Sequence, residues 1–298
     1  MSAPQTKATS NIGKREIIRA LWQLAKPSIV FFVLLTTGVG FFLASALPMD
    51  MVLLLHTLLA TGLVGAGSLA LNQWMERQAD GRMPRTAGRP IPAGRISAFA
   101  GFVWGTFLTM AGLAYLLLRI NLIAASVAAL TVATYLFAYT PLKRKTSLCI
   151  LAGAVSGALP PLIGWSASTG SLSSGAWTLF AIMYLWQIPH FLAIAWRYRD
   201  EYQVAGFLVL SESELNGPGL GRRMFFYSLA LLFASLLPTV VGLTGSFYFI
   251  GALLIGMAYL ALNTASLSTL NESAPVLFRA SLIYIVLLFS FMVIDKII

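Results

Sequence analysis

The sequence predicts an all-α, polytopic membrane protein with nine transmembrane helices and a cytoplasmic N-terminus. Of its 298 residues, 58% are hydrophobic and 10% are charged, whereas an ordinary soluble domain carries about 25% charged residues. The mean hydropathy of the chain is +0.82. A soluble globule of this length could not cover its surface with so few charges, so the composition excludes a soluble enzyme.

Stretches long enough to span a membrane follow one another along most of the chain. A transmembrane helix needs about 20 mostly apolar residues, and nine stretches meet this requirement. They cover residues 27–47, 51–73, 97–118, 121–140, 147–168, 176–196, 224–243, 247–268 and 276–294. The ninth contains Arg279, but near one end, where a long side chain can reach the lipid headgroups.

The chain divides into a short N-terminal segment and one large domain. Residues 1–26 are polar and then amphipathic, which predicts a cytoplasmic segment with a helix at the membrane interface. This segment lacks the apolar core and the cleavage site of a signal peptide. Residues 27–298 contain neither a soluble insertion nor a clear internal repeat, so we expect a single nine-helix domain.

The basic residues gather on one side of the predicted membrane. If nine spans alternate in direction, 18 of the 20 Lys and Arg residues fall on the side of the N-terminus, and only Arg119 and Lys296 on the other. The positive-inside rule makes the first side cytoplasmic. The basic excess therefore reflects topology, and the bilayer rather than nucleic acid is the expected partner.

Two of the ten acidic residues share a predicted helical face with an amide. Asn72, Glu76 and Asp80 are four residues apart, so on a helix they lie in one stripe. One amide and two carboxylates offer the oxygen ligands that Mg²⁺ prefers. The stripe is followed by a proline-rich loop that contains Arg82, Arg85, Arg89 and Arg95.

Two further polar stretches end predicted spans at the same membrane face. One is Arg199-Asp200-Glu201-Tyr202, and the other is Tyr139-Thr-Pro-Leu-Lys143-Arg144. Carboxylates mixed with basic side chains fit a Mg²⁺-bound diphosphate whose apolar tail enters the helix bundle, which indicates a prenyl diphosphate. The alternative is that these acids form only interfacial ion pairs, each contributing about 0–1 kcal/mol.

The polar stretches, and their order along the chain, resemble the motifs of the UbiA-type intramembrane prenyltransferases. The matching pieces are Asn72-x-x-x-Glu76-Arg77-x-x-Asp80-x-x-Met83-x-Arg85-Thr86-x-x-Arg89-Pro90, Tyr139-Thr-Pro-Leu-Lys143-Arg144, Gly157-x-x-Pro160-Pro161-Leu162-Ile163-Gly164-Trp165, Trp186-x-x-Pro189-His190-Phe191 and Arg199-Asp200-Glu201-Tyr202-x-x-Ala205-Gly206. Many family members carry a second Asp-x-x-x-Asp motif, whereas here Val204 stands four residues after Asp200. Which of Asp200 and Glu201 binds metal is therefore open.

The resemblance implies roles for the side chains of these motifs. The residues that would bind Mg²⁺ are Asn72, Glu76, Asp80, Asp200 and Glu201. The residues that would bind substrate are Arg77, Arg85, Arg89, Tyr139, Lys143, Arg144, Arg199, Tyr202, Trp186 and His190. Those that would take part in catalysis are Glu76, Asp80, Lys143 and His190.

Within the family, the resemblance is to the subgroup that prenylates haem. It implies transfer of farnesyl from farnesyl diphosphate to a vinyl group of protohaem IX (haem B), giving the hydroxyethylfarnesyl group of haem O. The charge distribution places the expected active site on the cytoplasmic side, and the very short N-terminal leader favours a bacterial inner (cytoplasmic) membrane. A downstream haem-modifying enzyme or terminal oxidase assembly is a further expected partner.

Two other functions remain open from the sequence. One is prenyl transfer to an aromatic or quinone precursor, which would share the diphosphate site and differ in the acceptor pocket. The other is membrane transport, which is disfavoured because the ionisable residues lie at one face and not at the bilayer midplane.

The two histidines lie in different surroundings along the sequence. His56 is near the far end of the second span, away from the acids, and we expect a structural role. His190 follows Pro189, which frees the carbonyl of Leu185 from helical hydrogen bonding. His190 could satisfy that carbonyl, or it could contact the haem, since imidazole is a common ligand of haem iron.

Overall fold

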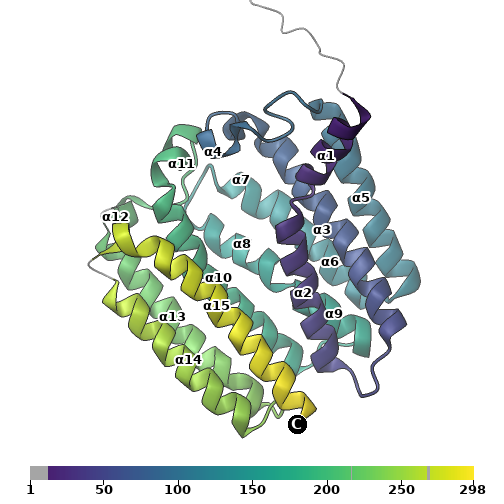
Figure 1. Ribbon diagram of the computed structural model, residues 1–298, viewed down its shortest axis with the longest axis vertical. Helices are drawn as coiled ribbons and strands as arrows, with labels where there is room; N and C mark the ends of the chain where they lie inside the picture. The colour runs from purple at the N-terminus through teal and green to yellow at the C-terminus, as the bar shows by residue number, and fades with distance from the viewer. Residues whose placement is uncertain (1–12, 216, 267–268) are drawn as a thin grey trace, which may run out of the picture.

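The computed structural model describes residues 13–215, 217–266 and 269–298. The elements of these ranges are helices throughout (Figure 1). They are α1 (Lys14–Leu24), α2 (Pro27–Ala44), α3 (Met51–Asp80), α4 (Pro84–Ala87), α5 (Ala98–Arg119), α6 (Leu122–Ala133), the π-helical turn η1 (Thr134–Tyr139), α7 (Thr140–Leu142), α8 (Cys149–Ala158), α9 (Pro160–Thr169), α10 (Ser174–Arg197), α11 (Arg199–Ala205), α12 (Glu212–Leu215), α13 (Pro218–Val240), α14 (Ser246–Ala265) and α15 (Leu270–Ile297).

The prediction of nine transmembrane helices is confirmed within the described ranges. Nine spans there are long and apolar enough to cross a membrane. They are α2, α3, α5, α6 with η1 and α7, α8 with α9, α10, α13, α14 and α15. Of the nine spans, the second departs most from its predicted bounds. It was predicted to end at residue 73, but α3 continues to Asp80 and carries Asn72, Glu76 and Asp80, which we call the acidic stripe.

Side-chain caps fix the start of three of these helices. Asp50 accepts a hydrogen bond from the Leu53 amide at 2.9 Å at the start of α3. Ser97 and Asn121 accept in the same way at the starts of α5 and α6. Such caps satisfy backbone donors that have no partner within the helix. They therefore stabilise the first turns of α3, α5 and α6.

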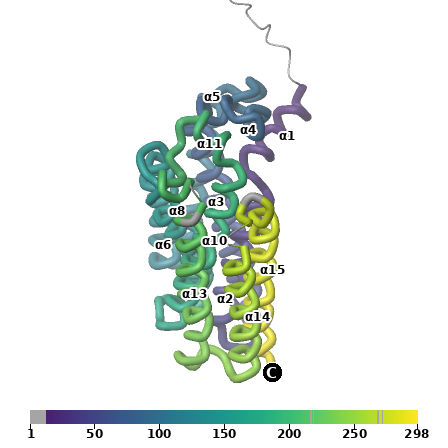
Figure 2. Tube along the Cα trace, turned by 90° about the vertical axis from the view of Figure 1, so that its left-hand side faces the viewer, coloured from purple at the N-terminus to yellow at the C-terminus, as the bar shows by residue number. Residues whose placement is uncertain are grey.

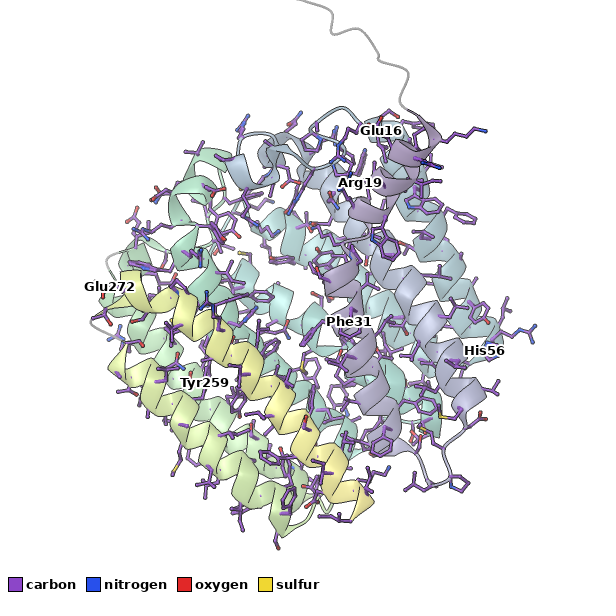
Figure 3. All side chains as sticks on the ribbon, viewed as in Figure 1. Glu16, Arg19, Phe31, His56, Tyr259 and Glu272 are labelled. Atoms are coloured by element: carbon purple, nitrogen blue, oxygen red, sulfur yellow. The ribbon has the colours of Figure 1, made fainter. Side chains whose placement is uncertain are left out.

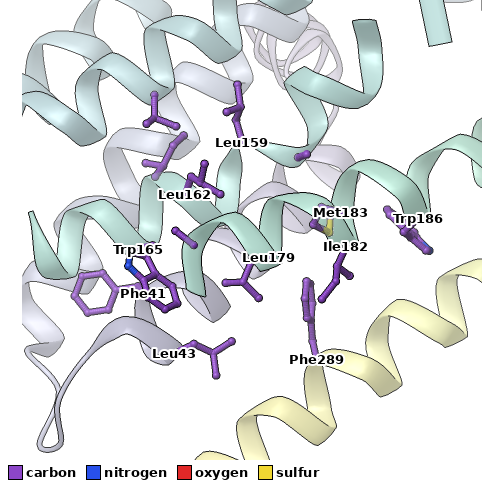
Figure 4. Packing of buried hydrophobic residues seen from close by; sticks show 14 of the residues in the cluster. Phe41, Leu43, Leu159, Leu162, Trp165, Leu179, Ile182, Met183, Trp186 and Phe289 are labelled. Atoms are coloured by element: carbon purple, nitrogen blue, oxygen red, sulfur yellow. The ribbon is translucent and has the colours of Figure 1, made fainter. Parts of the chain in front are cut away.

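The most buried spans are α8 with α9, and α10. Figure 4 shows Trp165 of α9 and Met183 of α10 packed with Phe41 of α2 and Phe289 of α15. The helices approach closely where glycine removes a side chain: a Cβ at Gly164 would lie 1.9 Å from the carbonyl oxygen of Thr37. Small residues at helix contacts are the usual means of packing helices in membranes.

The first and last spans are joined at the end of the molecule that holds the C-terminus. Lys296 of α15 donates hydrogen bonds to the carbonyl oxygens of Phe42, Leu43 and Ser45 at the end of α2, at 2.6, 2.9 and 2.6 Å. These carbonyls lack helical partners, so the ammonium completes the helix end.

The opposite end holds α1, α4 and α11, as both views show (Figures 1 and 2). The helix predicted within residues 1–26 forms as α1, and Ile18 and Trp22 on it are exposed. Its location at a membrane interface stays a prediction. Figure 3 places Glu16 and Arg19 at this end, and His56 at the outer edge of the molecule.

Candidate active site

The acidic stripe of α3 lies inside the protein. Asn72, Glu76 and Asp80 are 1%, 4% and 1% exposed. Because four residues are close to one helical turn, the three side chains follow one face of α3 toward its end. Buried carboxylates need partners, and each has a basic one.

Two ion pairs neutralise the carboxylates. The Nζ of Lys143 donates to Oε1 of Glu76 at 2.8 Å. The Nη1 of Arg89 donates to both oxygens of Asp80 at 2.7 Å. The Arg-Thr-x-x-Arg loop and the Tyr-Thr-Pro-Leu-Lys stretch are thereby brought to the acidic stripe.

A third cation at the stripe was missed by the sequence analysis. Lys26 lies between α1 and α2, and its Nζ is 3.5 Å from Oδ1 of Asn72. Its φ of 48° is left-handed, an unfavourable conformation for a side chain other than glycine. The only signal in the sequence was a basic residue next to Pro27 at the start of a span, which was counted as a topology determinant.

The surroundings shift the two lysines in opposite directions. Burial, with the nearby charge of Arg89, lowers the pKa of Lys26 to about 7. Burial also lowers the pKa of Lys143, but the adjacent Glu76 carboxylate outweighs this and holds that pKa well above its ordinary value. Lys143 therefore stays charged, whereas Lys26 is charged only in part near neutral pH.

The π-helical turn η1 places an aromatic ring beneath Lys143. The Nζ of Lys143 lies 4.3 Å from the ring centre of Tyr139, which in turn stacks on Tyr135 at 5.7 Å. Thr140 donates to the Tyr135 carbonyl at 2.8 Å and accepts from Nδ2 of Asn72 at 3.1 Å. A π-helical turn often marks a functional site, and here it turns these side chains toward α3.

The second acidic stretch lies against the arginine loop. The Arg85 amide donates to Oε2 of Glu201 at 3.4 Å, and the Arg85 guanidinium lies over the rings of Tyr198 and Tyr202, at 4.6 and 6.0 Å. Met83 packs with Phe207 in the same region. The two acidic stretches therefore meet at one end of the bundle.

The backbone after α11 also reaches the stripe. The Leu208 amide donates to the carbonyl oxygen of Lys143 at 2.6 Å, and the ring of Phe207 lies 5.7 Å from Lys143 Nζ. Phe207 is 4% exposed. This segment therefore covers the Glu76–Lys143 pair from one side and helps to exclude water.

Four predicted site residues lie apart from these contacts. Arg77 bonds to the Trp74 carbonyl at 2.8 Å and lies over the Trp74 ring. Arg144 is exposed. Arg199 bonds to the Trp196 carbonyl at 2.9 Å, and its 3.8 Å ion pair is with Asp200, whose side chain is 87% exposed.

His190 and Trp186 form a separate cluster between α10 and α15. The rings stack at 5.1 Å, and Phe278 lies 4.9 Å from His190. His190 Nδ1 is 2.7 Å from Oγ of Ser281, and Trp186 Nε1 donates to the Ser281 carbonyl at 2.6 Å. Within the described residues, His190 makes no hydrogen bond to the carbonyl of Leu185.

A small cavity of about 40 Å³ lies beside Lys143. Tyr139 and Lys143 line it from the side of the acidic stripe, and Phe191 and Ile194 line it from α10. Ile194 is one turn beyond His190 on the same face of α10. The cavity is much smaller than a prenyl chain.

The donor set of the stripe fits Mg²⁺. An amide oxygen and two carboxylates are hard oxygen ligands, and Mg²⁺ is commonly held by one or two carboxylates together with substrate phosphates. Within the described ranges, no three Asp, Glu, His or Cys side chains group closely enough to hold a metal alone.

Comparison with known proteins gives close relatives over nearly the whole chain. A protein from Solibacter usitatus named protoheme IX farnesyltransferase is 40% identical over 285 residues, which cover 92% of this chain and 97% of that protein. A protein of the same name from Koribacter versatilis is 37% identical over 306 residues, which cover 99% of each.

Solved structures share the fold. One described as digeranylgeranylglyceryl phosphate synthase in membranes matches with a TM-score of 0.80 at 16% identity, covering 95% of this chain and 99% of that one. A UbiA homolog from Archaeoglobus fulgidus bound to GPP and Mg²⁺ matches with a TM-score of 0.67 at 14% identity, covering 92% and 99%. The model of the UbiA prenyltransferase family matches residues 33–291. This chain therefore belongs to the UbiA prenyltransferase family.

Proposed function

We propose that this chain transfers the farnesyl group of farnesyl diphosphate to a vinyl group of protohaem IX. Support for the acceptor comes from relatives that are named protoheme IX farnesyltransferase and are 40% and 37% identical to this chain. Support for the donor comes from the buried acidic stripe, where carboxylates and cations meet at one end of an apolar bundle. The observation that carries the proposal is this stripe with its paired cations.

In the proposed complex, the cations exchange partners when the diphosphate enters. Arg89 and Lys143 now neutralise Asp80 and Glu76, and Lys26 lies beside Asn72. These cations would turn to the diphosphate oxygens, because charge-assisted hydrogen bonds to phosphate are stronger than neutral ones. Arg89 and Lys143 would then stabilise the charge that develops on the leaving group.

Asn72, Glu76 and Asp80 are the residues that would hold Mg²⁺, and the bound ion would supply positive charge to the diphosphate leaving group. Glu201 is the better candidate for a second metal set, because it contacts the Arg85 loop, whereas Asp200 points its side chain into solvent. The allylic cation must be kept from water until it meets the vinyl carbon. Once the new C–C bond has formed, water adds to the resulting cation and loses a proton, which supplies the hydroxyl group of the product. Phe207 and Tyr139, which flank Lys143, would exclude that water.

We further propose that His190 and Trp186 contact the haem. His190 lies one helical turn from the cavity that borders Lys143, and Trp186 offers a flat ring beside it. The imidazole would ligate the iron, which would orient the macrocycle with a vinyl group toward the farnesyl C1.

The proposed location is a bacterial inner membrane, with the acidic stripe on the cytoplasmic side. Helices α1, α4 and α11 lie at one end of the molecule (Figure 1), and the arginine loop that includes α4 contacts Asp80 and Glu201. Basic residues at this end are what the positive-inside rule expects of a cytoplasmic face. A downstream haem-modifying enzyme or terminal oxidase assembly would receive the product.

The decisive experiment is mass spectrometry of haems extracted from cells that express the chain. We expect a haem carrying a hydroxyethylfarnesyl group, and its absence from cells that express the Asp80→Asn variant. A prenylated benzoate or quinone precursor in its place would overturn the proposed acceptor, and unmodified haem in both strains would overturn the proposed reaction.

A further inference from the structure

Ser281 of α15 is fully buried and contacts both rings of the proposed haem site. Its Oγ is 2.7 Å from His190 Nδ1, and its carbonyl oxygen accepts from Trp186 Nε1 at 2.6 Å. No motif in the sequence pointed to this residue. It lies 91 residues from His190, and only the packing of α10 against α15 brings the two together.

The hydrogen bonds of Ser281 determine the direction of the bond to His190. A serine hydroxyl has one proton to donate, and Ser281 Oγ donates it to the Phe278 carbonyl at 2.6 Å. With that proton donated to the Phe278 carbonyl, we assign Oγ as the acceptor from His190, which places the imidazole proton on Nδ1. The other ring nitrogen, Nε2, consequently carries a lone pair.

The ring nitrogen Nε2 is left available by the surrounding side chains. Trp186 and Phe278 pack against the imidazole with ring centres 5.1 and 4.9 Å away, at interplanar angles of 26° and 31°. Among the described residues, none forms a hydrogen bond to Nε2. His190 itself is buried, with 8% of the residue's surface exposed.

From these contacts we infer that Ser281 is a positioning residue, which fixes His190 in the tautomer whose Nε2 can ligate the iron of the haem acceptor. This inference rests on the proposed function. Histidines that ligate metals almost always donate the other ring N–H to a fixed acceptor, and loss of that acceptor typically weakens metal affinity by about 10- to 100-fold. Ser281 is the acceptor that this rule requires.

The test is titration of the purified full-length protein in detergent with ferric protohaem, followed by absorption and electron paramagnetic resonance spectroscopy. Ser281→Ala removes only the hydroxyl and leaves the carbonyl that holds Trp186. We expect about 10-fold weaker haem binding and an altered axial-ligand signature. Ser290→Ala is the matched control, because Ser290 is an exposed serine of α15 that bonds only to its own helix.

The double variant with His190→Ala separates this role from general packing. We expect it to resemble His190→Ala alone, since the two residues act through one contact. A Ser281→Ala variant with the affinity and spectrum of the unaltered protein, while His190→Ala changes both, would overturn the inference and leave the proposed function standing. An unaltered protein that neither binds protohaem nor yields farnesylated haem would instead overturn the proposed function itself.

Discussion

Each carboxylate of the acidic stripe contacts a cation from another segment of the chain. Glu76 pairs with Lys143 and Asp80 with Arg89, and the side chains of both acids are at most 6% exposed. Removing one charge of a buried pair costs about 3–5 kcal/mol, because the other charge is left unpaired. The same side chains therefore contribute to stability and, in the proposed reaction, to catalysis.

We expect Glu76→Gln and Asp80→Asn both to abolish farnesyl transfer. Glu76→Gln should also lower the thermal unfolding midpoint more, because the Lys143 side chain is 14% exposed and that of Arg89 is 25% exposed. Product yield and thermal unfolding in detergent would measure these effects. Glu212→Gln changes an exposed acid outside the site and serves as the control. Near-normal turnover of both site variants at limiting Mg²⁺ would contradict the metal assignment.

Lys26 lies in an environment that disfavours its charge, since burial lowers its pKa to about 7. We expect Lys26→Met to raise the thermal midpoint, because methionine keeps the apolar stem and removes the buried amine. The same change should weaken binding of farnesyl diphosphate by about 10- to 100-fold, the usual effect of losing one hydrogen bond to a charged group. Calorimetric titration with the diphosphate would measure the second effect.

Lys145→Met is the matched control for that experiment, because Lys145 is an exposed lysine outside the acidic stripe. If both variants bind the diphosphate equally well, Lys26 does not contact it. A loss of stability in Lys26→Met would show that the amine contributes more through Asn72 than its burial costs.

At the level of the element, the fit between η1 and α8 sets the position of Lys143. A Cβ at Gly153 of α8 would lie 2.8 Å from the Tyr139 ring, tighter than ordinary contact. The ring lies directly under the Lys143 ammonium. Any displacement of Tyr139 therefore moves the cation that pairs with Glu76.

Gly153→Ala should accordingly reduce turnover and destabilise the protein by about 1–3 kcal/mol, the usual cost of overpacking. Steady-state kinetics and thermal unfolding would record the two effects. Gly38→Ala in α2 is the comparison, because its added Cβ would meet only Leu58 at 3.9 Å. Equal behaviour of the two variants would mean that the Tyr139 ring adjusts freely.

For the whole molecule, the alternation of nine spans predicts which loops face the cytoplasm. The only cysteine, Cys149, is fully buried and should not react with a polar maleimide. We expect Ser171→Cys, in the loop between α9 and α10, to be labelled in intact spheroplasts. Lys145→Cys should be labelled only after lysis, since its loop belongs to the basic side. The reverse pattern would invert the topology and place the proposed site outside the cytoplasm.

Local properties of the sequence were sufficient to predict the spans and the acidic stripe. A segment within a bilayer must satisfy its own backbone hydrogen bonds, so about 20 apolar residues can only form a helix there. The spacing of Asn72, Glu76 and Asp80 is likewise a local property, because residues four apart share a helical face. The orientation follows from counting charges, which needs no knowledge of packing.

Contacts between distant segments were decided by the tertiary structure alone. Lys26 lies 46 residues from Asn72, and Ser281 lies 91 from His190. Arg77 stands inside the matching motif, yet it turns to Trp74 and away from the stripe. Which side chains meet depends on how the helices pack and how each is rotated about its axis. Hydrophobic periodicity cannot predict that rotation in this chain, because its spans are apolar on almost every side.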